Sequence, residues 1–495
     1  MVFASRRSIG LGVLVALLSA IVGWKFDIFH VYEFGGDEGY EVYKAFLITK
    51  GYLLYRDIWN DQPPIHTYLL AGLFRLFGPS IGVARCVSIF SAGGTALCLW
   101  MISRRTVGRC AATFVVLGFL AWPEVLMLSG SAMLEIPMLF LTTASLWLLD
   151  RSGSQQRFRI FAAASVFAIA VNVKFTALLF APYLLFELRP TSQFKPRLGE
   201  GFSIRTDLSE WFLRCAFFGV FFLGACAVIS VCCFEREAWD AIFKSHFAPV
   251  FPEFRIQAER YRFSWDLFAP VCEVVAIACV GVVYGGGERR AASFSAVLAL
   301  VALIAVHSTH QPFWQYYTIH FSIPTCLIAG VGVDWAVHWM FANCCQGLSR
   351  LTAIRAIGLL VGLLWVSGIT AFNVVELIRE VSSRPLVSTV ALVKKLRSES
   401  VPGEVVFSDQ PIVCFYAGSL MPPAIAVLPA KRFWSKQISV QEILSVLHKI
   451  DPKRIAVFGP DLREALRKNP PLGMQRDQSE INIDYWIRGE SNVRN

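Results

Sequence analysis

Long apolar segments alternate with short polar ones over the first three quarters of the chain. About eleven of them are apolar enough for a membrane helix, which needs roughly 17–25 residues. They cover residues 8–25, 84–102, 110–123, 131–149, 160–173, 175–188, 213–233, 266–284, 292–307, 317–334 and 354–373. The pattern predicts an α-helical polytopic membrane protein. Some segments are short, so the count can change by one or two.

The segment between the first two spans, residues 26–83, has a helical pattern of its own. Apolar residues recur at helical spacing over 38–50, and Gly51 follows as a stop signal. The pair Pro63-Pro64 opens a second such pattern, which ends at Gly78-Pro79. Neither helix is long enough to span a bilayer. Both are expected to lie in the membrane interface.

The composition changes after the last span. Helices are predicted at 387–396 and 438–450, and strands at 404–409 and 454–458. This alternation predicts a small α/β domain with a parallel sheet. The expected organisation is a transmembrane domain over 1–375, which includes a second large loop at 234–265, and a C-terminal domain over 376–495.

Composition and charge support a membrane location. The chain of 495 residues is 55% hydrophobic and 17% charged, whereas a soluble domain carries about 25% charged residues. Its net charge of +10 sits in short loops between spans, which is the positive-inside pattern and requires no nucleic acid. We therefore expect a plasma (inner) membrane protein with a cytoplasmic N-terminus. Loop 26–83, loop 234–265 and the C-terminal domain would be extracytoplasmic, and the first span is interpreted as an anchor.

Three acidic residues are candidates for chemistry. Asp37 and Glu38 follow two glycines at the membrane edge, and Glu135 lies at the outer end of the fourth span. A carboxylate at the membrane edge can act as a general base. Acids inside spans usually face a cavity or a partner. The alternatives are solubility for the first pair and a buried ion pair for Glu135.

Basic and aromatic residues on the same side are candidates for binding a phosphate. Lys174 lies between two spans, and its alternative role is snorkelling to the interface. Arg255 and Arg260 lie in loop 234–265, where attraction to anionic headgroups explains the same charges. The segment between the ninth and tenth spans carries three further candidates, which are His310, Tyr316 and Tyr317. An aromatic belt is the alternative for the two tyrosines.

Several pieces of the first loop occur in a characteristic order. They are Gly35-Gly36-Asp37-Glu38-Gly39-Tyr40, residues 51–57, Asp61-Gln62-Pro63-Pro64-Ile65-His66, residues 76–80, and Arg85. This loop resembles the first extracytoplasmic loop of the polyprenol-phosphate-sugar glycosyltransferases of the GT-C type. That superfamily includes the protein mannosyltransferases and the aminoarabinose transferases of lipid A.

The resemblance implies a GT-C fold and assigns roles to the candidates. Asp37 would be the base, Glu38 would orient it or the acceptor, and Glu135 would match a second acidic position. His310, Tyr316 and Tyr317 would line the donor pocket. Gln62 departs from the aminoarabinose-transferase pattern, because a lysine that contacts the donor phosphate usually stands there. Phosphate neutralisation must then come from elsewhere, or donor recognition differs.

The implied activity is the transfer of a hexosyl or pentosyl group from a polyprenyl-phosphate-linked donor, with inversion. The implied partners are that donor, membrane lipids and an envelope acceptor, which is a lipid, a glycan or a protein. Two alternatives stay open: a transporter or flippase of lipid-linked saccharides, and a wall-polymer ligase. No metal-ligand spacing occurs in the sequence, and a divalent cation as cofactor is left open.

Overall fold

The computed structural model describes ten stretches of the chain. They are residues 32–33, 37–149, 156–190, 204–234, 237–247, 251–284, 288–344, 387–401, 404–477 and 483–488, together with the single residues 368, 372, 375 and 379. The predicted span at 8–25, and nearly all of that at 354–373, lie outside the described residues.

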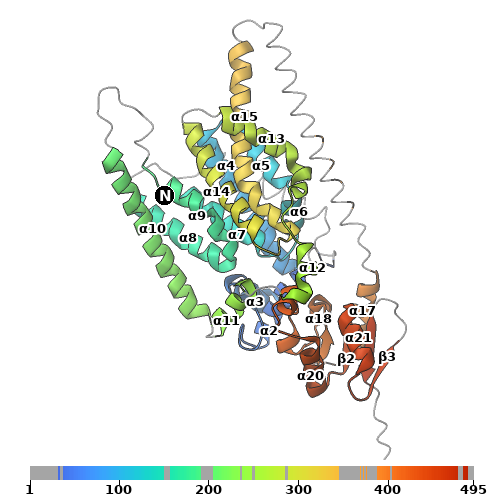
Figure 1. Cartoon of the computed structure of the whole chain (residues 1–495). Coiled ribbons are helices and arrows are strands. Elements are labelled where there is room, and N and C mark those ends of the chain that lie inside the picture. The colour runs from blue at the N-terminus through green and yellow to red at the C-terminus, as the bar shows by residue number, and fades with distance from the viewer. Residues whose placement is uncertain are drawn as a thin grey trace, which may run out of the picture.

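A bundle of helices forms the larger part of the molecule (Figure 1). Each predicted span within the described residues coincides with a helix or with two consecutive short ones. These elements are α4 (Ile81–Thr106), α5 (Arg109–Leu120), α6 (Pro123–Ser129), α7 (Glu135–Leu148), α8 (Gln156–Val173), η1 (Phe175–Phe180), α9 (Ala181–Glu187), α10 (Ile204–Cys233), η4 (Trp265–Val271), α13 (Cys272–Tyr284), α14 (Glu288–Thr309), η5 (Gln315–Thr318) and α15 (Ile319–Cys344).

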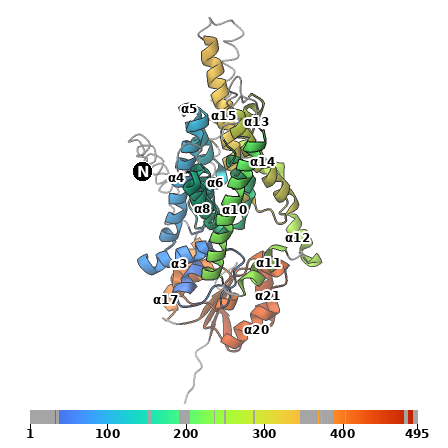
Figure 2. The same ribbon diagram turned by 90° about the vertical axis from the view of Figure 1, so that its left-hand side faces the viewer.

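By length and composition, four of the described helices can cross a membrane: α4, α8, α10, and the segment Gln315–Trp339, which comprises η5 and most of α15. A fifth crossing results if α5 and α6, which are bent by 66° relative to each other, form one broken span. The larger number of spans stays a prediction. In α15, 94% of the apolar window is buried, whereas in α10 only 6% is. We therefore interpret α15 as the centre of the bundle and α10 as a lipid-facing helix (Figures 1 and 2).

The first loop forms both expected helices, α2 (Glu38–Thr49) and α3 (Ile65–Phe77). Gly51 has a φ of +94°, which a glycine adopts without strain. Ten of the twelve residues of α2 are buried, and the location of this helix in the membrane interface stays a prediction. The helix is apolar on more than one side and packs against protein. Helix α3 exposes Leu69, Leu76 and Phe77, which suits contact with lipid.

The C-terminal domain contains a four-stranded sheet in the order β1-β2-β4-β3. The strands are β1 (Val406–Ser408), β2 (Arg454–Val457), β3 (Met474–Asp477) and β4 (Asp484–Arg488). The two strands predicted from the sequence, at 404–409 and 454–458, are β1 and β2, and they pair in parallel as expected. Strands β3 and β4, which were not predicted, add antiparallel pairings, so the sheet is mixed. Strands β3 and β4 follow each other closely in sequence and pair as antiparallel neighbours.

Helices surround this sheet, in the part coloured orange and red in Figure 1. They are α17 (Val387–Glu399), α18 (Pro411–Ala417), η6 (Pro423–Ile425), α19 (Ala430–Trp434), α20 (Val440–Ile450) and α21 (Pro460–Lys468). Helix α20 begins with a capping box formed by Ser439 and Glu442. Its Ile443 and Leu447 are buried against the domain, as the sequence pattern predicts.

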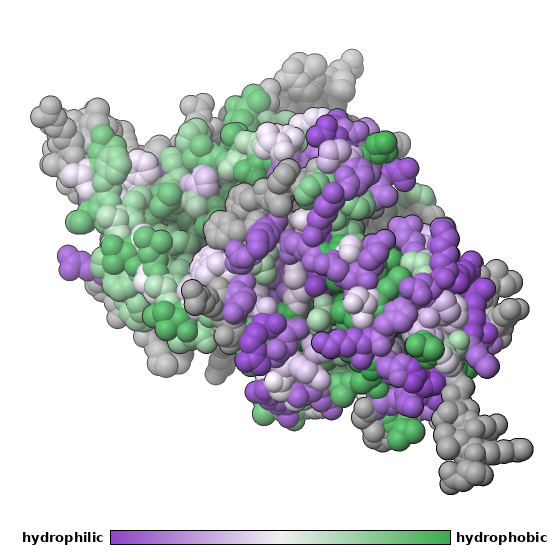
Figure 3. Space-filling view, turned by 60° about the horizontal axis from the view of Figure 1, so that its bottom comes forward, coloured by the Kyte–Doolittle hydropathy of each residue, from purple (hydrophilic) through white to green (hydrophobic). Residues whose placement is uncertain are grey.

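The first loop and the C-terminal domain share one hydrophobic core. Buried side chains of α2 and α3 belong to the same cluster as those of β1, β2 and α18. The Tyr43 hydroxyl in α2 donates to the Ser419 carbonyl (2.9 Å) and accepts from the Met421 N–H (2.7 Å). Hydrophilic residues cover the end of the molecule that holds this domain, whereas hydrophobic ones cover the bundle behind it (Figure 3).

Three short elements connect the bundle with this end of the molecule. They are α11 (Ala238–Phe247), η3 (Pro252–Phe254) and α12 (Arg255–Glu259). The Phe251 N–H donates to the Trp434 carbonyl of α19, and the Phe313 N–H donates to the Tyr261 carbonyl. The second large loop is thereby held between the C-terminal domain and the start of η5.

A fully buried ion pair fixes the first loop to the bundle. The Arg85 guanidinium in α4 donates from Nε and Nη2 to the two oxygens of Glu38, each at 2.7 Å. The Ala132 N–H, between α6 and α7, donates to the same carboxylate (2.8 Å). Both charged side chains are completely buried, so the attraction between them offsets the free-energy cost of removing each charge from water.

We expect Glu38→Gln to destabilise the protein, because it removes the carboxylate that pairs with both Nε and Nη2 of the buried Arg85 guanidinium. Removing one partner of a buried pair costs about 3–5 kcal/mol. The double variant Glu38→Gln/Arg85→Met should regain part of that loss, since no isolated charge stays behind. The measurement is the unfolding temperature of the purified protein in detergent.

The control is Glu259→Gln, which breaks an exposed pair with Arg262 and should leave the unfolding temperature unchanged. A double variant no more stable than Glu38→Gln would contradict the role given to the buried pair.

Candidate active site

Asp37 stands at the N-terminus of α2, with its carboxylate directed to the bundle. It is the N-cap residue, yet its side chain makes no capping hydrogen bond. Oδ2 instead accepts a hydrogen bond from the Tyr316 hydroxyl in η5 (2.9 Å). Burial raises the pKa of the Asp37 carboxyl above its ordinary value, while the hydrogen bond from Tyr316 opposes this rise. The carboxylate is therefore both oriented and more basic than one in water.

Lys174 and Glu135 form a buried ion pair beside Tyr316. Lys174 has an extended backbone between α8 and η1, and this break in the helical segment carries its side chain into the bundle. Its ammonium lies over the rings of Tyr316 (5.5 Å) and Tyr317 (5.0 Å). These cation–π contacts and Glu135 keep a positive charge close to Asp37.

Two further charged residues, which the sequence did not single out, lie at the same place. Asp61 precedes the Gln62-Pro63-Pro64 turn, and its Oδ2 lies 4.0 Å from the Lys431 ammonium of the C-terminal domain. Burial raises the pKa of Asp61, but Lys431, His246, Lys44 and a backbone hydrogen bond together outweigh this effect and leave the pKa below its usual value. Burial lowers the pKa of Lys431.

The position of Asp61 beside the proline pair was a usable signal, because it belongs to the motif that the sequence shows. Lys431 had none. It lies about 370 residues further along the chain and approaches the site only because the C-terminal domain packs on α2.

Two histidines lie near Lys431. Burial, followed by the charge of Lys431, lowers the pKa of His246 to about 4 and also lowers that of His310. Both imidazoles are therefore neutral at pH 7. His310 thus approaches the site as predicted from the sequence, and His246 of α11 joins it.

A buried network supports the loop beneath these groups. The Lys44 ammonium in α2 donates to Glu41 and to the Asn60 side chain, each at 2.7 Å. The Asn60 amide donates to the Gln62 carbonyl (2.6 Å), and the Tyr55 hydroxyl donates to the same oxygen (2.7 Å). The backbone of Gln62 is thereby fixed next to Asp61.

The remaining predicted residues fall into two groups. Glu38 is buried and accepts hydrogen bonds from Arg85 and from the Ala132 N–H, so we interpret it as a residue that holds the loop. Arg255 and Arg260 are exposed on and just after α12, which fits headgroup contact better than a role at Asp37. Within the described residues, no three His, Cys, Asp or Glu side chains are arranged to hold a metal ion.

The site therefore combines one oriented carboxylate, Asp37, with two ammonium groups, Lys174 and Lys431. It lies where the bundle, the first loop and the C-terminal domain meet. A carboxylate of this kind can accept a proton, and the ammonium groups can stabilise an anion such as a phosphate.

Comparisons with known proteins agree with this fold. Residues 61–200 match the sequence profile of the dolichyl-phosphate-mannose-protein mannosyltransferase family. This segment contains Glu135 and Lys174 but begins after Asp37. No curated protein sequence matches the chain.

Solved structures match over nearly the whole chain. ArnT from Cupriavidus metallidurans bound to undecaprenyl phosphate has a TM-score of 0.64 and 16% identity, with 99% of each chain covered. The archaeal oligosaccharyltransferase AglB from Archaeoglobus fulgidus, in complex with an inhibitory peptide and a dolichol-phosphate, has a TM-score of 0.56 and 11% identity. That match covers 100% of this chain and 75% of AglB. The predicted resemblance is thus confirmed, and the chain has the fold of the GT-C glycosyltransferases.

Proposed function

We propose that this chain, which has the GT-C fold, is a membrane glycosyltransferase that uses a polyprenyl-phosphate-linked sugar. The observation that carries the proposal is the meeting of Asp37 with Lys174 at Tyr316. The reaction needs a base for the acceptor and a positive charge for the departing phosphate, and both lie there. Relatives of the same fold have been solved with undecaprenyl phosphate and with a dolichol-phosphate.

In the proposed mechanism, Asp37 takes the proton from an acceptor hydroxyl or amine. The acceptor atom forms a bond to the anomeric carbon of the sugar, and the bond from that carbon to the phosphate oxygen breaks. The polyprenyl phosphate leaves with the electron pair, and one displacement inverts the anomeric centre. Lys174 and Lys431 stabilise the phosphate, while Tyr316 orients Asp37.

Glu38 and Glu135 have supporting roles in this proposal. Glu135 holds the Lys174 ammonium and keeps it charged. Glu38 anchors the first turn of α2 and thereby positions Asp37. Gln62 would supply hydrogen bonds at the edge of the donor site, where its amide replaces a charge.

The proposed orientation follows from the two ends of α4. This helix begins at Ile81, near α3, and carries Arg104 and Arg105 in its last turn. At 1.5 Å per residue its 26 residues span about 39 Å, enough to cross a plasma membrane. The positive-inside rule then supports a cytoplasmic end at Arg104, with Asp37 and the C-terminal domain on the outer face.

We expect Asp37→Asn to abolish transfer, because asparagine keeps the shape of the side chain but cannot accept a proton. Loss of a general base typically reduces the rate by about 10²–10⁴-fold. The measurement is mass spectrometry of envelope glycolipids and glycans in a deletion strain that expresses either form at equal membrane levels. Asp240→Asn, on the exposed face of α11, is the matched control.

A sugar-sized mass that is absent in the deletion should return with the wild type and with Asp240→Asn, but not with Asp37→Asn. Full complementation by Asp37→Asn would remove Asp37 from the mechanism. A deletion that changes no glycan would favour the transporter alternative, which requires no turnover of the donor.

We expect Lys174→Gln to weaken binding of polyprenyl phosphate, because a charge-assisted contact of about 1.5–3 kcal/mol is lost. That corresponds to an increase in Kd of about 10- to 100-fold. The single variant also leaves Glu135 buried and unpaired. Glu135→Gln/Lys174→Gln avoids this isolated charge, so it should fold normally and still bind the lipid poorly. Unchanged affinity in a stable double variant would exclude Lys174 from the donor site.

We expect Tyr316→Phe to move the acid limb of the pH–rate profile to higher pH. The transfer rate falls as the pH drops through the pKa of Asp37, since the base must be deprotonated. The hydroxyl of Tyr316 lowers that pKa, so its removal should shift the limb upward by about one unit. Tyr485→Phe, which loses a hydrogen bond to the distant Glu399, is the control. A limb that stays in place or moves to lower pH would argue against Asp37 as the titrating base.

A further inference from the structure

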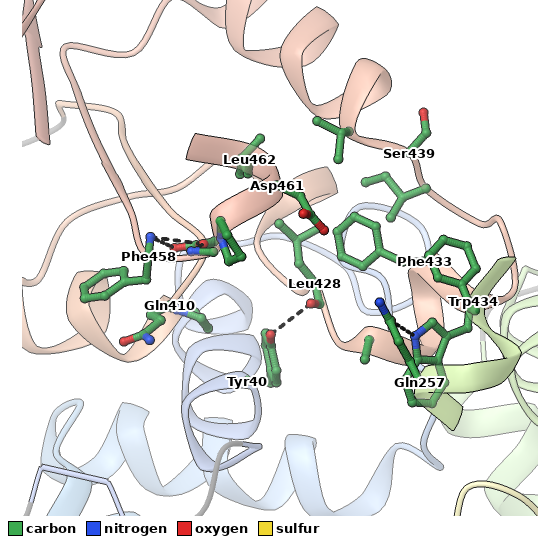
Figure 4. A pocket seen from close by; sticks show the side chains of 18 of the residues that line it. Tyr40, Gln257, Gln410, Leu428, Phe433, Trp434, Ser439, Phe458, Asp461 and Leu462 are labelled. Atoms are coloured by element: carbon green, nitrogen blue, oxygen red, sulfur yellow. Dashed lines mark hydrogen bonds between the residues drawn. The ribbon is translucent and has the colours of Figure 1, made fainter. Parts of the chain in front are cut away.

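A large cavity lies between the first loop and the C-terminal domain, and the mechanism above does not use it. Its volume is about 860 Å³, inside the range of roughly 300–1,000 Å³ that small-molecule sites occupy. Its lining comes from α2, from the segment around Gln257 and from the C-terminal domain (Figure 4).

The cavity opens at the carboxyl ends of the two parallel strands. Asp409 follows β1 and Phe458 follows β2, and both line the cavity. The Asp409 carboxylate accepts hydrogen bonds from the N–H groups of Phe458 (2.9 Å) and Gly459 (2.6 Å), so these ends are held together. In open α/β sheets, ligands bind at this edge of the strands.

The opposite walls are also held in place. The Tyr40 hydroxyl of α2 donates to the Leu428 carbonyl (3.0 Å). Trp434 is buried and stacks on Trp314, with 6.0 Å between ring centroids and 16° between ring planes. Both Tyr40 and Trp434 line the cavity, so its aromatic walls have a fixed spacing.

The lining combines aromatic faces with amides and carboxylates. Phe433 and Trp434 offer rings, Gln257 and Gln410 offer amides, and Glu33 and Asp461 offer carboxylates. A sugar ring presents C–H groups on its face, which pack on aromatic rings, and hydroxyls around its edge, which bond to amides and carboxylates.

The charge of the lining is acidic. Four carboxylates line the cavity, those of Glu33, Glu253, Asp409 and Asp461, against one ammonium, that of Lys436. Lys436 already pairs with Glu253 (2.7 Å). This balance disfavours a phosphorylated or otherwise anionic ligand and suits a neutral or cationic one.

The cavity lies next to the proposed base. Tyr40 and Asp37 are three residues apart at the start of α2, so they lie on one face of the helix. Glu33, which also lines the cavity, accepts a hydrogen bond from the Gly39 N–H (3.1 Å). A molecule held in the cavity can therefore extend one group along α2 to Asp37.

We propose that this cavity binds the acceptor, and that the acceptor is a saccharide without negative charge, either neutral or bearing an amine. The proposal rests on the proposed function, because it names the acceptor class of that same reaction. The acceptor would approach Asp37 from the C-terminal domain, while the donor phosphate lies on the side of Lys174. Burial raises the pKa of Glu33 to about 7, so at neutral pH this carboxyl can donate to a sugar oxygen as well as accept.

The test compares two activities of the full chain in nanodiscs. One is the slow hydrolysis of the donor, in which the sugar is transferred to water. The donor is a mixture of labelled polyprenyl-phosphate-linked sugars extracted from the host membrane. The other is transfer to an envelope extract from the deletion strain. We expect Phe433→Ala and Asp461→Asn each to raise the KM for the acceptor by about tenfold or more, with the transfer to water unchanged. Glu464→Gln, on α21 outside the cavity, should change neither activity.

Free oligosaccharides test the chemical class. A neutral mannose trimer or a glucosamine trimer should inhibit transfer to the extract without affecting transfer to water. Inhibition only by a galacturonic acid trimer or by a peptide would overturn the saccharide assignment.

Two other outcomes would overturn the site. If both variants reduce the two activities equally, the cavity serves the donor, and if neither variant changes acceptor KM, the cavity is not used. No donor consumption by the wild type would overturn the proposed function itself, and this proposal with it.

Discussion

The buried pair of Glu38 and Arg85 sets the geometry on which the site depends. Glu38 is the residue after Asp37, and its carboxylate also accepts the Ala132 N–H, three residues before Glu135. The ring of His66 in α3 contacts the carbonyl of the same Ala132 (3.0 Å). One carboxylate thus joins the first turn of α2, the beginning of α4 and the segment just before α7. Two buried charges that form a pair must stay close together. The contacts of Glu38 with Arg85 and Ala132 therefore set the distance between Asp37 and the Glu135–Lys174 ion pair, although they involve neither Asp37 nor that ion pair.

The C-terminal domain completes this site instead of being attached beside it. Its core continues into α2 through Tyr43 and into α3 through Phe74, and it places Lys431 beside Asp61. Helix α2, which begins next to Asp37, thus shares its core with this domain, and burial raises the pKa of Asp37.

Much of this arrangement follows from local sequence, and the rest does not. Apolar periodicity located the helices of the bundle. Gly51 marked the end of α2 and Pro63-Pro64 marked the start of α3, because these signals act within a few residues. The partner of Glu38, the approach of Lys431 and the burial of α2 depend on contacts between distant segments. Asp37, Lys174, Tyr316 and Tyr317 lie together; the resemblance had singled out Asp37 and the two tyrosines, and the position between two spans had singled out Lys174. Arg255 and Arg260 carry the positive charge of their loop but are exposed. The sequence shows the charge of a residue but not whether it is packed in the site.

The two proposed binding regions near Asp37 differ in charge, and this difference would give the reaction a direction. Lys174 and Lys431 belong to the proposed donor region, where they would stabilise an anionic phosphate. The proposed acceptor cavity carries the carboxylates of Glu33, Asp409 and Asp461. A donor with a phosphate would be attracted to the first region and repelled from the second, whereas an uncharged or amine-bearing molecule would not be repelled. Both substrates carry sugar hydroxyls, so charge is the property by which the two regions would distinguish them. In the proposed reaction Asp37 is the group that both substrates reach, which is the requirement for direct transfer between them.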